Sequence, residues 1–170
     1  SLTCGDREIE LYNVGPAHTR GDILTHLPGD RLIFTGDIIF NGGHPVIWDG
    51  PISNWQKACD IILSLDADVV VPGHGPVTDK AHVRVFKGYL DYIAAETRKC
   101  FDAGLSEWDA AGEISLADYD TWGDAERFIG NVYALYREFR DDGSEPEVMP
   151  VFEEMARFHK EVILPRLAAG

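Results

Sequence analysis

The chain has 170 residues, of which 45% are hydrophobic and 26% are charged, a balance typical of one folded globular domain rather than of a disordered chain. Fifteen lysines and arginines stand against 29 aspartates and glutamates, which gives a formal net charge of −14. A surface of this charge repels polyphosphate, so we expect neither nucleic acid nor a membrane as a partner.

The cysteines and the hydropathy of the chain bear on its compartment. Cys4, Cys59 and Cys100 are odd in number and widely separated, which argues against a disulfide framework, and they lack the C-x-x-C spacing of a zinc cluster. No segment approaches the ~20 apolar residues of a membrane span. We therefore expect a cytoplasmic protein.

The first half of the chain is predicted to be rich in short strands. Residues 8–14 alternate apolar and polar side chains, as a half-buried strand does. Residues 23–27 and 31–35 flank Pro28-Gly29-Asp30, which predicts a hairpin with a turn at its tip.

A helix and a buried strand follow the hairpin. Ser53-Asn54-Trp55-Gln56 fits a capping box, and the apolar residues after it continue at helical spacing. Residues 68–71 form a short apolar run before Pro72-Gly73, which predicts a buried strand.

After residue 78 the pattern is helical. Thr78 or Asp79 can cap a long helix that ends near Phe101, and Ser106 can cap a short helix. The predicted helices after the first cover residues 107–112, 124–140 and 150–164. We expect an α/β (α+β) fold in which residues 1–78 form one part and residues 79–170 complete and extend the same domain.

Three side chains with metal-ligating chemistry occupy loops that follow or join the predicted strands. His18 lies in the loop Val14–Asp22, Asp37 follows the apolar run Leu32–Thr35, and His74 stands between two glycines after the predicted strand 68–71. A carboxylate at the end of a buried strand is costly unless it binds a cation or several donors. Two imidazoles and one carboxylate suit Zn²⁺, and they equally suit Fe(II).

These segments resemble the metallo-β-lactamase superfamily. The runs are G-P-A-H-T-R-G-D, then L-I-F-T-G-D-I-I-F, then V-V-P-G-H-G, in the family's order over residues 8–80. The resemblance implies the second half of a four-layer αββα sandwich, followed by a helical C-terminal extension. It further implies that His18, Asp37 and His74 are metal ligands and that the complete protein binds one or two Zn²⁺ ions. Where two ions bind, Asp37 bridges them, and it takes part in catalysis. The substrate is expected to be a small molecule.

The family's first motif, H-x-H-x-D-H, is missing from the chain. The seventeen residues before His18 hold no other histidine. We therefore expect the chain to be the C-terminal part of a longer protein, and to be weak or inactive on its own. It would then pair with the missing N-terminal half or form a homo-oligomer.

Two further residues border the expected site. His44 lies in the loop after the Asp37 segment, which borders the site in the resembling family, so we predict either contact with substrate or a solvated loop position. Asp22 is expected either to orient a metal ligand or to fix the turn around Gly21.

Three functions follow as hypotheses. The first is a metal-dependent hydrolase that uses a metal-activated water on an ester, thioester, lactam or related bond. The second is a mono-iron oxidoreductase of the same superfamily, with Fe²⁺ in place of Zn²⁺. The third is an inactive structural or interaction fragment that packs an exposed apolar sheet against a partner.

Overall fold

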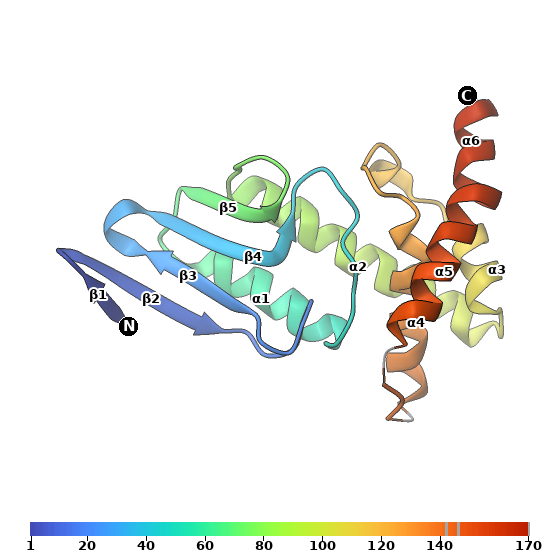
Figure 1. The fold of residues 1–170 in the computed structure, drawn as a ribbon, viewed down its shortest axis with the longest axis horizontal. Coiled ribbons are helices and arrows are strands. Elements are labelled where there is room, and N and C mark those ends of the chain that lie inside the picture. Colours follow the sequence, from blue (N-terminus) through green and yellow to red (C-terminus); the bar gives the residue numbers. More distant parts are fainter. Residues whose placement is uncertain (142, 146, 170) are drawn as a thin grey trace. The chain divides into compact units, whose positions relative to one another are not determined.

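The computed structural model describes residues 1–141, 143–145 and 147–169. It combines one sheet with a series of helices (Figure 1), which confirms the mixed α/β class. The chain forms two compact units, the first made of residues 1–41 and 49–91 and the second of residues 42–48 and 92–170. The predicted change of pattern near residue 78 coincides with the start of a long helix, whereas the units divide inside that helix.

The first unit is built on a five-stranded sheet with the strand order β1-β2-β3-β4-β5. The first three pairings are antiparallel, and β4 pairs with β5 in parallel. A parallel pair needs a crossover connection, and helix α1 (Ile52–Ser64) supplies it. The strands are β1 Leu2–Cys4, β2 Arg7–Asn13, β3 Ile23–Leu27, β4 Leu32–Phe40 and β5 Val69–His74.

The predicted hairpin is confirmed, with one local difference. Pro28–Asp30 form a 3₁₀ turn, η1, and Arg31 adopts a left-handed backbone conformation with φ of 51°. Strand β4 therefore begins at Leu32 rather than at Arg31. The Arg31 guanidinium donates to both carboxylate oxygens of Asp68, at 2.6 and 2.8 Å, and so fastens the hairpin turn to the start of β5.

The two faces of the sheet differ in exposure. Leu24, Ile33 and Val70 are fully buried on one face, and α1 lies on the same side as the start of α2 (Lys80–Asp102) in Figure 1. The opposite face carries apolar side chains that stay in solvent, which we call the open apolar face. Its members and their exposed fractions are Leu11 46%, Ile23 48%, Phe34 42% and Val69 38%.

Of the two N-caps predicted for α1 and α2, one was wrong and one is confirmed. Pro51 is the N-cap residue of α1, with φ of −66° and an extended ψ, and no side chain caps this end. The predicted capping box was wrong, because the proline starts the helix before Ser53 and leaves that residue inside the first turn. At α2 the Oδ1 atom of Asp79 accepts hydrogen bonds from the backbone N–H groups of Ala81 and His82, which confirms the predicted cap.

The second unit is helical. Ser106 caps α3 (Glu107–Glu113) as predicted, by accepting from the Asp109 N–H at 3.1 Å. Helix α4 (Arg127–Arg140) begins three residues later than predicted, because Asp124 has φ of +60°. The remaining elements are η2 Ala117–Tyr119, α5 Val148–Phe158, a π-helical turn at His159–Ile163 and α6 Leu164–Ala169.

Buried side chains of α4 form the centre of this unit. Phe128, Ile129, Val132 and Leu135 are at most 1% exposed. The buried Asn131 side chain accepts from the Ile47 N–H at 2.9 Å and donates to the Pro45 carbonyl at 3.0 Å, so it fixes the segment 42–48. Over the ranges that the structure describes, no helix is both long and apolar enough to cross a membrane.

Candidate metal centre

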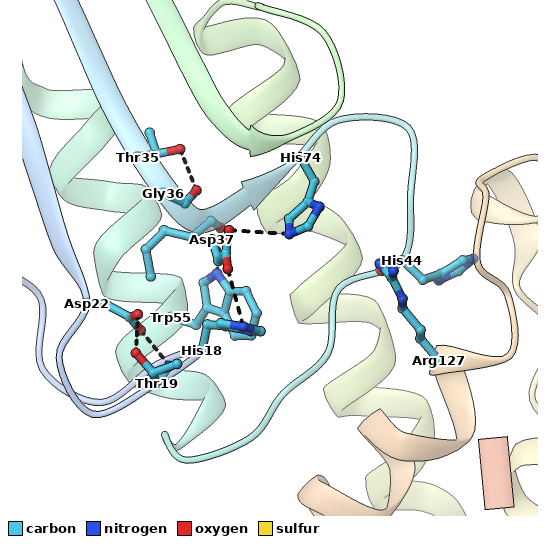
Figure 2. Close-up of polar contacts among 11 residues, drawn as sticks. His18, Thr19, Asp22, Thr35, Gly36, Asp37, His44, Trp55, His74 and Arg127 are labelled. Carbon is cyan, nitrogen blue, oxygen red and sulfur yellow. Dashed lines mark hydrogen bonds and ion pairs between the residues drawn. The ribbon is translucent and has the colours of Figure 1, made fainter. Parts of the chain in front are cut away.

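The loop between β2 and β3 presents His18. The loop is closed at its base where the Val14 N–H donates to the Asp22 carbonyl. The Asp22 carboxylate accepts from both the backbone N–H and the hydroxyl of Thr19, at 2.9 and 2.7 Å (Figure 2). These bonds are those of a turn-fixing residue, and Asp22 thereby holds the residue next to His18.

The other side of this loop lies against the chain at the start of α1. The Gly50 N–H donates to the Ala17 carbonyl at 3.1 Å, and the Asn54 amide donates to the Pro16 carbonyl at 3.3 Å. A Cβ atom on Gly50 would lie 2.1 Å from the Pro16 oxygen, so only glycine permits this approach. The backbone that carries His18 is therefore held from two sides.

Asp37 lies inside β4 and not at the end of a strand. This part of the prediction was wrong, because β4 continues to Phe40 through a stretch where its register with β5 shifts. Gly36, with φ of +52°, lies at that irregularity. A Cβ atom on Gly73 would be 2.2 Å from Asp37 Oδ1, so the carboxylate rests directly against the Gly73 backbone.

His74 is the last residue of β5, which continues three residues beyond the predicted strand 68–71, so the predicted loop position of His74 was wrong. Its carbonyl accepts from the Asn41 N–H at 2.9 Å, which joins the ends of β4 and β5. Gly75 has φ of +85°, and a Cβ atom there would meet the Asn41 oxygen at 2.0 Å. The two glycines that flank His74 serve other residues, because Gly73 makes room for Asp37 and Gly75 makes room for Asn41.

The structure brings His18, Asp37 and His74 together (Figure 2). His18 Nε2 lies 3.5 Å from Asp37 Oδ2, and His74 Nε2 lies 3.3 Å from Asp37 Oδ1. Their side chains are exposed by 13% for His18, 41% for Asp37 and 51% for His74. Each carboxylate oxygen thus faces one imidazole, in a setting that solvent can reach.

The distance between each histidine nitrogen and the Asp37 oxygen that it faces fits two ligands of one metal ion. Two ligands of a tetrahedral zinc, each about 2.0–2.2 Å from the metal, lie about 3.3–3.5 Å apart. Both histidine–carboxylate separations fall at this spacing. Nevertheless, no group of three or more His, Cys, Asp or Glu side chains within the described ranges could hold an ion by itself. The three residues therefore form two His–Asp pairs that share Asp37, each at the spacing of two zinc ligands.

Aromatic side chains surround these pairs, and the sequence prediction missed their contribution. The Trp55 ring meets His18 edge-on, with centroids 5.9 Å apart, and its indole N–H donates to the Ile38 carbonyl at 2.6 Å. Phe40 contacts both histidine rings. The final letter of the G-D-I-I-F run was the available signal, since it places an aromatic ring three residues after the aspartate.

His44 belongs to the second unit, where its side chain is fully buried. Its N–H donates to the Gly123 carbonyl at 2.9 Å, its own carbonyl accepts from Arg127, and its ring lies 5.8 Å from that of Trp122. Burial lowers the pKa of His44 to about 4. The predicted solvated position of His44 was therefore wrong, whereas contact of His44 with substrate stays a prediction.

The other histidines make contacts of a structural kind. His26 is buried and its Nδ1 lies 2.9 Å from a Glu10 oxygen. His82 Nε2 lies 3.0 Å from the Phe40 carbonyl oxygen, and His159 Nδ1 lies 3.3 Å from Glu126. The three cysteines form no disulfide, as predicted.

Residues 5–74 are similar to a known protein family. A family model described as the metallo-beta-lactamase superfamily matches residues 5–74, a range that contains His18, Asp37 and His74. Residues 5–74 belong to the metallo-beta-lactamase superfamily. The fold agrees, because a metallo-beta-lactamase family protein from Thermus thermophilus superposes with a TM-score of 0.63 at 15% identity, over 84% of this chain and 47% of that one.

Curated relatives are similar over 43% to 75% of this chain. The Caenorhabditis elegans beta-lactamase-like protein 2 homolog is 26% identical over 75% of this chain and 43% of its own length. A probable hydroxyacylglutathione hydrolase of Schizosaccharomyces pombe is 32% identical over 44% of this chain and 30% of its own length. A Homo sapiens acyl-coenzyme A thioesterase is 28% identical over 43% of this chain and 28% of its own length. The chain spans less than half the length of these relatives.

Proposed function

We propose that the chain carries part of the active site of a metal-dependent hydrolase. The observation that supports this most strongly is the shared carboxylate of Asp37, which faces His18 with one oxygen and His74 with the other at ligand-to-ligand spacing. Two imidazoles and a carboxylate are the ligand types that zinc takes in hydrolytic sites. The superfamily match over residues 5–74 supports the same chemistry.

In this proposal His18, Asp37 and His74 would hold the metal, because each oxygen of Asp37 faces one of the two imidazoles. When bound, the metal would lower the pKa of a water molecule and polarise the bond to be cleaved. The protein's part is to hold three donors in place before the metal arrives. His18 is held by a loop fixed from two sides, and Asp37 by its contact with Gly73.

The site on this chain is incomplete in our proposal. Each ion would receive one imidazole and one carboxylate oxygen from His18, Asp37 and His74, whereas a zinc site in a hydrolase usually has three protein ligands. We infer that further ligands come from a segment outside this chain. The chain alone should therefore bind zinc weakly and turn over little or no substrate.

The names of the relatives support one substrate class over the others. The similar proteins include a probable hydroxyacylglutathione hydrolase and an acyl-coenzyme A thioesterase. We therefore place thioesters first among the ester, thioester, lactam and related bonds that this chemistry can cleave. Fe²⁺ in place of Zn²⁺ is the alternative, because the same donors suit a mono-iron oxidoreductase.

Zinc titration of the purified chain, followed by calorimetry, tests the assignment. His18→Ala, Asp37→Ala and His74→Ala should each weaken binding, with Asp37→Ala the most severe because both pairs lose a ligand. His159→Ala is the matched control, since this half-exposed histidine pairs with Glu126 in the second unit. Unchanged binding in all three site variants would overturn the assignment. Iron found after anaerobic purification, together with oxygen consumption, would favour the oxidoreductase.

A second proposal concerns the open apolar face. Four partly exposed apolar side chains on one side of a sheet are unusual for a surface in water and typical of an interface. We propose that a second copy of this chain covers this face with its own sheet. Sedimentation should show self-association that Phe34→Ser weakens. Leu167→Ser, at a 73% exposed position on α6, should leave it unchanged, and a monomer at high concentration would contradict the proposal.

A further inference from the structure

Phe40, the last residue of β4, contacts both candidate histidine ligands. Its ring stacks on the imidazole of His74, with centroids 4.4 Å apart and planes 12° apart. The same ring lies 5.9 Å from the imidazole of His18 at a tilt of 56°. Phe40 itself is 2% exposed, so a buried ring forms the surface on which the half-exposed His74 rests.

The two histidines depend on this ring to different degrees. His18 is 13% exposed and also contacts the Trp55 ring, whereas the side chain of His74 is 51% exposed at the end of its strand. A half-exposed side chain ordinarily populates several rotamers. The parallel stacking on Phe40 favours the rotamer in which His74 Nε2 points at Asp37.

Phe40 is in turn held in place from its inner side. Its ring lies parallel to that of Phe86, with centroids 6.4 Å apart, and 6.4 Å from the ring of Trp55. Its carbonyl oxygen lies 3.0 Å from His82 Nε2, which ties the end of β4 to the first turn of α2. The stacking partner of His74 is therefore a fixed surface.

We propose that Phe40 is a positioning residue that orients the His74 imidazole toward Asp37. The proposal rests on the proposed function, because it gives His74 the role of a metal ligand. It adds a residue that touches neither metal nor substrate and acts through the ring that it supports.

The first arm of the test is proton NMR of the metal-free chain, with the His74 ring signals assigned by His74→Ala. A stacked aromatic ring shields the protons above it, so Phe40→Leu should move the His74 ring signals downfield. Phe128→Leu is the matched control, because it removes an equally buried ring from the second unit and should leave those signals in place. Phe40→Met serves as a second variant if Phe40→Leu fails to fold.

The second arm is zinc affinity measured by calorimetry on the same variants. Loss of a side chain that orients a ligand typically weakens metal binding about tenfold or more. We therefore expect about tenfold weaker binding for Phe40→Leu and less than twofold for Phe128→Leu. Unmoved His74 signals, or equal effects of the two variants, would overturn the proposal and leave Phe40 a packing role. Absence of zinc binding by the unaltered chain would refute the proposed metal role, while the NMR arm would still decide the positioning.

Discussion

Replacing Gly73 with alanine should displace the carboxylate of Asp37. The new Cβ atom would lie 2.2 Å from Asp37 Oδ1 and 2.6 Å from the Gly36 carbonyl carbon. Cβ contacts shorter than 3.0 Å are essentially never found, so the carboxylate must move by about 1 Å and the β4 backbone must give way as well.

The size of the effect follows from these distances. A shift of about 1 Å removes Asp37 from the 3.3 and 3.5 Å contacts with the two imidazoles. Overpacking of this kind costs about 1–3 kcal/mol of unfolding free energy, and misplacing a ligand lowers metal affinity by about 10–100-fold. Gly73→Ala should therefore lose both stability and zinc binding.

Urea unfolding and zinc calorimetry on the same preparation measure the two effects. Gly29→Ala is the control, because a Cβ atom there meets nothing within 4 Å; it should leave both quantities unchanged. If Gly73→Ala were as stable as the unaltered chain and bound zinc equally well, the packing of Asp37 on Gly73 would not be what positions the carboxylate.

Two further predictions concern the second unit. Burial lowers the pKa of His44 from 6.5 to about 4, so the folded state favours the neutral ring. The free energy of unfolding is therefore unaffected by this group above pH 6.5 and falls by about 3 kcal/mol as the pH is lowered to 4, because the unfolded chain then binds a proton that the folded chain does not. Urea unfolding at pH 7 and pH 4.5 should show this loss reduced in His44→Gln, and an identical pH dependence would contradict it. Asn131→Ala should lower the free energy of unfolding by at least about 2 kcal/mol, because the Ile47 N–H and the Pro45 carbonyl lose their partner in a buried place; an unchanged urea midpoint would refute this.

The loop position of His18 was predictable from the sequence because its surroundings are local. The glycines and prolines beside His18 and His74 mark loops and strand ends that the backbone alone dictates, and the hairpin at Pro28–Asp30 is likewise local. Alternation and helical spacing predicted β2, α2 and α3 for the same reason.

The remaining features depend on contacts between distant residues. Gly73 of β5 leaves space for the Asp37 carboxylate of the neighbouring strand β4. Helix α4 begins later than predicted because Asp124 takes a left-handed conformation. His44 is buried by Gly123, Trp122 and Arg127, roughly eighty residues away along the chain. No pattern within a short stretch of sequence carries that information.

The most direct measurement is anomalous diffraction at the zinc edge from crystals of the chain grown with zinc. We predict zinc at Asp37, within about 2.0–2.2 Å of a carboxylate oxygen and of Nε2 of His18 or His74, and no density there in Asp37→Ala. Zinc bound elsewhere, for instance at His159 and Glu126, with none at Asp37, would contradict the assignment of this metal centre.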